Sequence, residues 1–148
     1  MLDKRRYLMD ITALGFDKDV RAQALDDART KLVGYPKNGC AITLWSALNR
    51  VCHFDSGPPV FMTNDIIDQA RKLGFQVVLG HPLPELGDIF VTTDLNQNGV
   101  PDHVGIVLGV VGPNHFFCFD NGGAPYRRNI TKVEPHRTPV AYYLRLPS

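Results

Sequence analysis

The sequence predicts an α+β fold in which an N-terminal set of helices packs on an antiparallel β-sheet formed by later segments. Two observations support this. Apolar residues recur at helical spacing up to about residue 74, and from Phe75 onward the apolar runs are short, β-branched and broken by Gly, Pro and Asn. Helices that precede strands, rather than alternate with them, are typical of an α+β architecture.

Four helices are expected in the first half of the chain. In the third, apolar residues form one stripe that begins at Cys40. The fourth begins with Thr63 or Asn64 as its N-cap and ends before Gly74. The expected helices cover roughly residues 2–13, 18–31, 40–51 and 63–73.

Five segments are expected to be strands because they are apolar, rich in β-branched or aromatic residues and bounded by turn residues. They are "FQVVLG", "GDIFVTT", "HVGIVLGVV", "HFFCFD" and "VAYYLRL". The stretch "APYRRNI" between the last two is interpreted as a solvated turn; the alternative is that its arginines clamp a carboxylate. The 148 residues are expected to form one domain with three parts: a helical part (1–33), a core (34–121) and C-terminal strands (122–148).

Composition excludes several classes of partner. The net charge is +1, with acidic and basic residues mixed along the chain, so neither nucleic acid nor an anionic membrane is expected as a partner. No apolar run is long enough to cross a bilayer. In the N-terminal segment Asp10 interrupts the apolar part, so no signal peptide is predicted and the protein is expected to be made in the cytoplasm.

The three cysteines do not indicate a disulfide framework or a zinc site, since their number is odd and their spacing suits neither. Cys52 and Cys118 are expected to be buried and inert. Cys40 differs because it opens a predicted helix, where the backbone amides and the helix dipole favour an anion and make a thiol more nucleophilic. The alternative is that Cys40 is a small buried residue.

His103 begins the predicted strand "HVGIVLGVV", far from Cys40 in the sequence. A cysteine and a histidine that only the fold brings together are the usual pair for thiol acyl transfer, although a packed core histidine is the alternative. A polar residue at the end of the next strand would complete the order seen in papain-type enzymes. Asp120 and Asn121 both stand there, and strand alternation lets only one of them reach His103.

Three stretches, in this order, resemble the NlpC/P60–CHAP superfamily of papain-like peptidoglycan hydrolases. They are "NGCAITLWSALNRV", "LPELGDIFVTTD" and "DHVGIVLG", within residues 34–121. The resemblance implies a papain-like fold, with Cys40 as nucleophile, His103 as general base and Asp120 or Asn121 as the third member. It also implies that the chain hydrolyses an amide bond of the bacterial cell-wall peptide, as an amidase or endopeptidase, with no cofactor required.

Substrate contacts are less constrained by the sequence. No glutamine stands where papain places its oxyanion donor, so the Cys40 amide with Tyr35 or Asn38 is expected to serve, and Arg127 is the candidate for a substrate carboxylate. The expected partner is the stem peptide of peptidoglycan, reached during phage lysis or through a secretion system, with an inhibitor or immunity protein as a further partner. The alternatives are a papain-like protease or deamidase acting on a protein, and a non-catalytic binding domain on the same scaffold.

The loop "DLNQNGVPD" resembles the first nine positions of a calcium-binding loop, with oxygen ligands at alternate positions and a glycine for the turn. Gly105 stands where the twelfth-position acid belongs, and the alternative is a polar loop between two strands. The candidate calcium ligands are Asp94, Asn96, Asn98, the Val100 carbonyl and Asp102.

Overall fold

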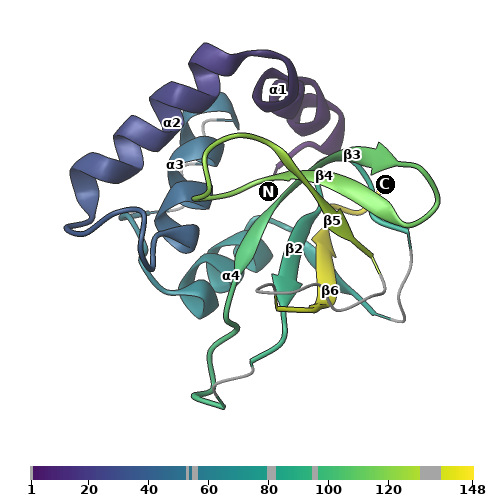
Figure 1. Ribbon diagram of the computed structural model, residues 1–148. Helices are drawn as coiled ribbons and strands as arrows, with labels where there is room; N and C mark the ends of the chain where they lie inside the picture. The colour runs from purple at the N-terminus through teal and green to yellow at the C-terminus, as the bar shows by residue number, and fades with distance from the viewer. Residues whose placement is uncertain (1, 53, 55–56, 80–82, 95–96, 131–137) are drawn as a thin grey trace.

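A computed structural model describes residues 2–52, 54, 57–79, 83–94, 97–130 and 138–148. Four helices precede the sheet: α1 (Lys4–Phe16), α2 (Lys18–Lys31), α3 (Cys40–Cys52) and α4 (Thr63–Lys72). Six strands follow: β1 (Gln76–Val78), β2 (Ile89–Thr92), β3 (Val104–Val111), β4 (His115–Phe119), β5 (Tyr126–Asn129) and β6 (Val140–Arg145). The helices pack against the sheet, so the predicted α+β class is confirmed (Figure 1).

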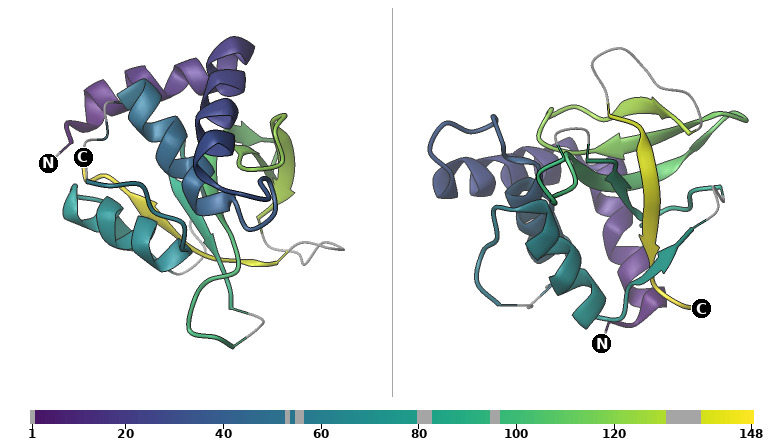
Figure 2. Two further views of the ribbon diagram at one scale, coloured as in Figure 1. Left: turned by 90° about the vertical axis from the view of Figure 1, so that its left-hand side faces the viewer. Right: turned by 90° about the horizontal axis from the view of Figure 1, so that it is seen from below.

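The strands form one antiparallel sheet in the order β1-β6-β2-β3-β4-β5. The last strand, β6, lies between β1 and β2 and pairs with both. The C-terminal segment therefore joins the first strand to the rest of the sheet. The two views in Figure 2 show the first three helices grouped on one side of the sheet. Strands β2, β3, β4 and β5 are neighbours in the sheet in the same order as in the sequence.

Helix α3 is the centre of the helical layer, because it packs against the other three helices and against β3. Its apolar stripe is buried as expected, and burial extends around the helix to Ile42 and Ser46. The core beneath it joins α1, through Ile11 and Leu14, to Ile106 of β3. Burial on this scale is the main source of stability for a domain of this size.

The N-terminal caps of α2 and α4 differ in how they are formed. Asp17 caps α2, since its side chain accepts hydrogen bonds from the amides of Asp19 and Val20 at 2.9 and 3.3 Å. The prediction that Thr63 or Asn64 caps α4 was wrong: the cap residue is Met62. The Thr63 hydroxyl instead donates to the Pro101 carbonyl at 2.6 Å and joins the helix to the loop before β3.

The stretch "APYRRNI" is not a solvated turn, because its residues 126–129 form β5 at the edge of the sheet. Phe116 of β4 lies opposite Arg128 in the register. The turn interpretation failed because the strand carries two arginines, one of which, Arg128, is only 5 % exposed. No helix within the described part of the chain is long and apolar enough to cross a membrane.

Candidate active site

Cys40 is the first residue of α3, as the sequence predicts, and is 8 % exposed. Gly39 directly precedes the helix, and its carbonyl accepts the Thr43 amide at 2.9 Å. The amides of the first turn have no carbonyl four residues earlier within the helix, so they are available to an anion at the Cys40 thiol or at a substrate oxygen beside it.

Gly39 leaves room for the packing of the loop before α3. A Cβ at this position would lie 2.7 Å from the Tyr35 ring and 2.9 Å from the Pro36 carbonyl oxygen. The Tyr35 hydroxyl shares a hydrogen bond of 2.6 Å with the Thr43 hydroxyl on the first turn of α3. Tyr35 therefore braces the start of the helix that carries Cys40.

His103 stands immediately before β3 and is held there by β2. Its amide donates to the Thr92 hydroxyl at 2.9 Å, and its carbonyl accepts the Thr92 amide at 3.0 Å. The Phe90 ring lies beside the imidazole, with ring centroids 5.8 Å apart. Gly105 makes room for this ring, because a Cβ there would lie 2.5 Å from Phe90, which accounts physically for the glycine of "HVGI".

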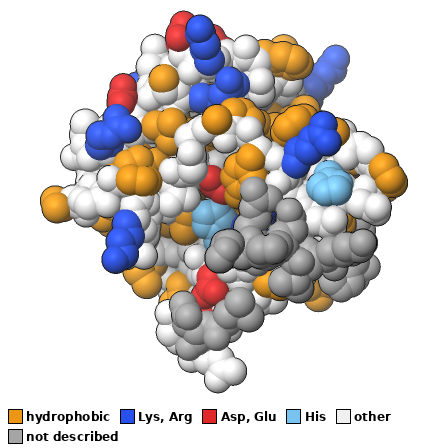
Figure 3. All heavy atoms as spheres, viewed as in Figure 1, with side chains coloured by type: hydrophobic (Ala, Val, Ile, Leu, Met, Phe, Trp, Pro, Cys, Tyr) orange, Lys and Arg blue, Asp and Glu red, His pale blue; other side chains and the backbone are white. Residues whose placement is uncertain are grey.

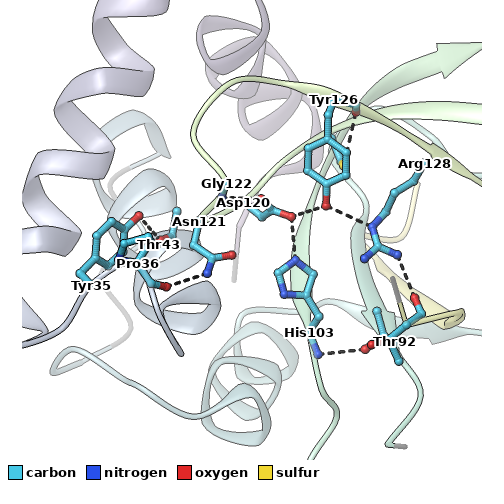
Figure 4. Close-up of polar contacts among 12 residues, drawn as sticks. Tyr35, Pro36, Thr43, Thr92, His103, Asp120, Asn121, Gly122, Tyr126 and Arg128 are labelled. Carbon is cyan, nitrogen blue, oxygen red and sulfur yellow. Dashed lines mark hydrogen bonds and ion pairs between the residues drawn. The ribbon is translucent and has the colours of Figure 1, made fainter. Parts of the chain in front are cut away.

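Asp120, and not Asn121, reaches the histidine. The carboxylate Oδ2 of Asp120 lies 2.6 Å from His103 Nε2, and the Gly122 amide donates to Oδ1 at 2.8 Å (Figure 4). Asn121 points the other way and donates from Nδ2 to the Pro36 carbonyl at 2.8 Å. The predicted alternation is thus seen: one residue orients the imidazole, and the next ties β4 to the loop before α3.

The charges around His103 favour an imidazolium. Burial alone would lower the pKa of His103, but hydrogen bonding to Asp120 and to the Cys40 thiol, together with the charges of both groups, raises it to about 9. For Asp120 burial opposes ionisation, whereas hydrogen bonding and charge from His103, followed by the Tyr126 and Gly122 donors, lower its pKa below the ordinary value. Because Asp120 occupies Nε2, Nδ1 is the nitrogen left to interact with Cys40.

Two residues of β5 extend this arrangement. The Tyr126 hydroxyl donates to Asp120 Oδ2, and Arg128 Nε donates to the Tyr126 oxygen at 3.2 Å (Figure 4). Sequence reasoning did not find this role, although the order Tyr-X-Arg on a strand places both side chains on one face. The role was missed because residues 126–129 were interpreted as a turn and not as a strand.

An open groove of about 650 Å³ lies beside His103 and Asp120. A hollow that contains a histidine and a neighbouring acidic side chain is visible near the centre of this face (Figure 3). Cys40 is not among the residues that line this groove. The lining residues are Gly34, Pro36, Lys37, Asp102, His103, Asp120, Asn121, Gly122, Tyr126, Arg128 and Thr138.

The other predicted substrate residues lie at the margin of the groove or outside its lining. Asn38 is exposed in the loop before α3 and has a left-handed backbone, with φ of 57°. Arg127 is exposed, and its guanidinium lies 5.5 Å from the centre of the Phe117 ring. Arg128, not Arg127, is the arginine that lines the groove.

The predicted calcium loop is closed by its own hydrogen bonds. Asp94 accepts from the Asn98 and Gly99 amides at 3.3 and 2.7 Å, and the Asn98 side chain accepts from the Val100 amide at 3.0 Å. Asn96 lies outside the described residues. Within the ranges described, no cluster of three or more His, Cys, Asp or Glu side chains could hold a metal ion, and calcium binding stays a prediction.

Comparisons with known proteins do not place the chain in a family. No protein-family model matches it, and no curated protein matches it closely enough in sequence to be counted as a relative. The chemistry of the site therefore has to be judged from its geometry. A thiol at a helix start, an imidazole and an orienting carboxylate can together activate a nucleophile and transfer its proton to a leaving group.

Proposed function

We propose that this chain is a papain-like cysteine hydrolase that cleaves an amide bond of the bacterial cell-wall peptide. The observation that carries the proposal is the 2.6 Å contact between His103 and Asp120, in an imidazole that also interacts with Cys40 at the start of α3. A histidine that only served packing would need neither a buried carboxylate nor a thiol.

In the proposed reaction, the thiol proton of Cys40 passes to Nδ1 of His103, and the sulfur attacks the carbonyl carbon of the substrate amide. First-turn amides of α3 stabilise the oxyanion that forms. The C–N bond breaks as His103 returns the proton to the leaving amine, which leaves a thioester on Cys40. Water, deprotonated by His103, then hydrolyses the thioester and restores the thiol. Asp120 keeps the imidazole in one tautomer and stabilises its cationic form.

The class of substrate rests on the resemblance of three motifs to peptidoglycan hydrolases, and the groove is compatible with it. A volume of about 650 Å³ is within the range of sites that hold a small peptide. Lys37 and Arg128 line the groove together with Asp102, so it offers both charges to a peptide that carries amino and carboxylate groups. Delivery to the wall by phage lysis or by a secretion system is part of the proposal.

The test is digestion of purified sacculi by the wild-type protein, by Cys40→Ala and by His103→Ala, with the products identified by mass spectrometry. We expect new muropeptide fragments from the wild type and a loss of at least about a thousand-fold in rate in both variants. The fragment masses identify the bond. Arg127→Met is a matched control, because its side chain lies outside the groove lining and its loss is expected to leave the rate unchanged.

Intact sacculi of several chemotypes, with and without calcium, would contradict the proposed substrate. Proteolysis or deamidation of a protein by the wild type, absent in Cys40→Ala, would then favour a papain-like enzyme acting on proteins. If alkylation of Cys40 leaves every measured function intact, the chain is a binding domain and the catalytic assignment is wrong.

A further inference from the structure

The carboxylate of Asp120 belongs to a hydrogen-bond chain longer than the three predicted residues. Tyr126 and Arg128 stand two positions apart on β5, so their side chains share the face of the sheet that lines the groove. Tyr126 donates to Asp120, and Arg128 Nε donates to Tyr126 at 3.2 Å. A second bond, from Arg128 Nη1 to the Thr138 carbonyl at 2.9 Å, holds the guanidinium in place (Figure 4).

The donors and acceptors along this chain allow one arrangement of protons. Arginine has donors only, so the phenol oxygen of Tyr126 must accept from Arg128 and use its own proton toward Asp120. Oδ2 of Asp120 then accepts from both Tyr126 and His103, while Oδ1 accepts from the Gly122 amide at 2.8 Å. A carboxylate surrounded by donors is ionised, so Nε2 of His103 carries a proton and Nδ1 is the nitrogen that takes the proton of Cys40.

The hydrogen-bond chain from Arg128 to Asp120 is largely buried. Arg128 is 5 % exposed and Asp120 is 4 % exposed, and the guanidinium lies 5.0 Å from the centre of the Phe90 ring, which also lies beside His103. Among the described residues, no carboxylate forms a direct ion pair with Arg128. Burying a cation without a carboxylate partner costs free energy. The effect of the Arg128 charge on Asp120, through Tyr126, is a functional reason for that cost.

Tyr126 is suited to remain a donor at every working pH. Burial, followed by the nearby Cys118 and the charge of Asp120, raises the pKa of Tyr126 above its ordinary value. Its proton therefore stays in place while His103 and Cys40 exchange theirs.

We infer that Tyr126 and Arg128 are positioning residues, which keep Asp120 ionised and aimed at His103 and so prepare the imidazole to activate Cys40. The inference rests on the proposed roles of Cys40 and His103. It does not depend on the identity of the substrate, since it concerns the thiol–imidazole pair of the free protein.

The test measures the rate at which iodoacetamide alkylates Cys40 as a function of pH in the intact protein, with the modified peptide identified by mass spectrometry. Tyr126→Phe removes one donor to Asp120, which raises the pKa of that carboxyl. As the pH is lowered, Asp120 is then neutralised at a higher pH and stops stabilising the His103 imidazolium there. We expect the acid-side midpoint of the alkylation profile to move upward by about one pH unit.

The matched variants separate this effect from ordinary packing. Arg128→Met should move the midpoint in the same direction, and it should have no further effect when Tyr126 is already Phe, because both residues act through one chain. Arg128→Lys retains a donor and should restore much of the wild-type profile. Arg127→Met, on the neighbouring residue whose guanidinium stacks on Phe117, should change nothing.

An unchanged pH profile in folded Tyr126→Phe and Arg128→Met, or additive shifts in the double variant, would overturn the inference and leave the two residues a structural role alone. If Tyr126→Phe does not fold, the comparison of Arg128→Lys with Arg128→Met decides the question. A wild-type protein that shows the expected profile but leaves sacculi intact refutes the proposed substrate and not this inference. Ordinary thiol behaviour of Cys40 in the wild type refutes both.

Discussion

Two aspartates of this protein are equally buried and differ in their partners. Asp88, directly before β2, is 1 % exposed, and Asp120, directly after β4, is 4 % exposed. Asp88 is bound by the guanidinium of Arg145, whereas Asp120 is bound by His103 and Tyr126. Both carboxylates also accept a backbone amide, from Glu85 and Gly122 respectively.

The arginine partner makes the first site a permanent connection within the fold. Arg145 of β6 donates from Nε and Nη2 to the two oxygens of Asp88, at 2.8 and 2.7 Å, and also pairs with Glu85 at 2.8 Å. Hydrogen bonding to Asp88 is the largest of the effects that raise the pKa of Arg145, so this cation never loses its proton. The site joins the segment before β2 to β6 through a cation that stays charged.

The histidine partner lets the Asp120 site gain and lose a proton. The imidazole of His103 gains and loses a proton within an accessible pH range, it lies in the wall of a groove, and a thiol interacts with it. The comparison teaches that burial of a carboxylate does not identify a reactive site. The partner's ability to titrate, and a space for a substrate beside it, make that distinction.

The largest effect is expected from removing the charge of Asp120 beside His103. Asp120→Asn retains the shape of the side chain but removes the charge that supports the imidazolium, so we expect amide hydrolysis to fall by about 10²–10⁴-fold. Steady-state kinetics on the sacculus fragments identified above would measure it, with circular dichroism to confirm folding. A variant with full activity would show that His103 works without an orienting carboxylate.

Removing the charge of Asp88 beside Arg145 should lower the stability of the fold and leave the reactivity of Cys40 unchanged. Asp88→Asn leaves the Arg145 guanidinium with only the exposed Glu85 as a charged partner, and we expect a loss of about 3 kcal/mol in the free energy of unfolding. Urea denaturation measures this loss. Alkylation of Cys40 should be unchanged under conditions where the variant is folded, and a changed pH profile would mean that the two sites are coupled.

Between about pH 6.5 and 9, the change of stability with pH should come mainly from His103. The pKa of His103 is raised from an ordinary 6.5 to about 9, so its contribution to folding is full below about pH 6.5 and is lost as the pH rises through about 9. On the order of 2–3 kcal/mol should separate wild type from His103→Gln at pH 6 and disappear toward pH 10. Denaturation at pH 6, 8 and 10 tests this, with His115→Gln as the control. A difference that persists unchanged to pH 10 would contradict the raised pKa.

The smallest effect is expected from an ion pair that is neither buried nor reactive. Arg50 donates from Nε and Nη2 to Asp27 at 2.8 and 2.9 Å between α3 and α2, and both side chains are about one-third exposed. Arg50→Gln should cost less than about 1 kcal/mol in urea denaturation, because exposed pairs contribute little. A cost comparable to that of Asp88→Asn would mean that the geometry of a pair matters more than its burial.

Much of the fold could be predicted because its signals are local. The stripe beginning at Cys40 depends on residues a few positions apart, and α2 and α3 match the expected ranges closely. The first helix runs from Lys4 to Phe16 and not over 2–13, a shift of a few residues at each end. Edge strand β5 was missed because its arginines resemble a turn unless the neighbouring strand is known.

The sequence by itself determined the order of the elements and the candidates for the site: a cysteine at a helix start, a histidine before a strand, and two polar residues after the next strand. These follow from local periodicity and from the residue types. Only the tertiary structure decided that Asp120 faces His103 while Asn121 faces Pro36, and that Arg128 is buried beside the site. The reason is physical: which face of a strand is turned inward, and which strand lies beside it, depend on pairing across the whole sheet, and no local pattern contains that information.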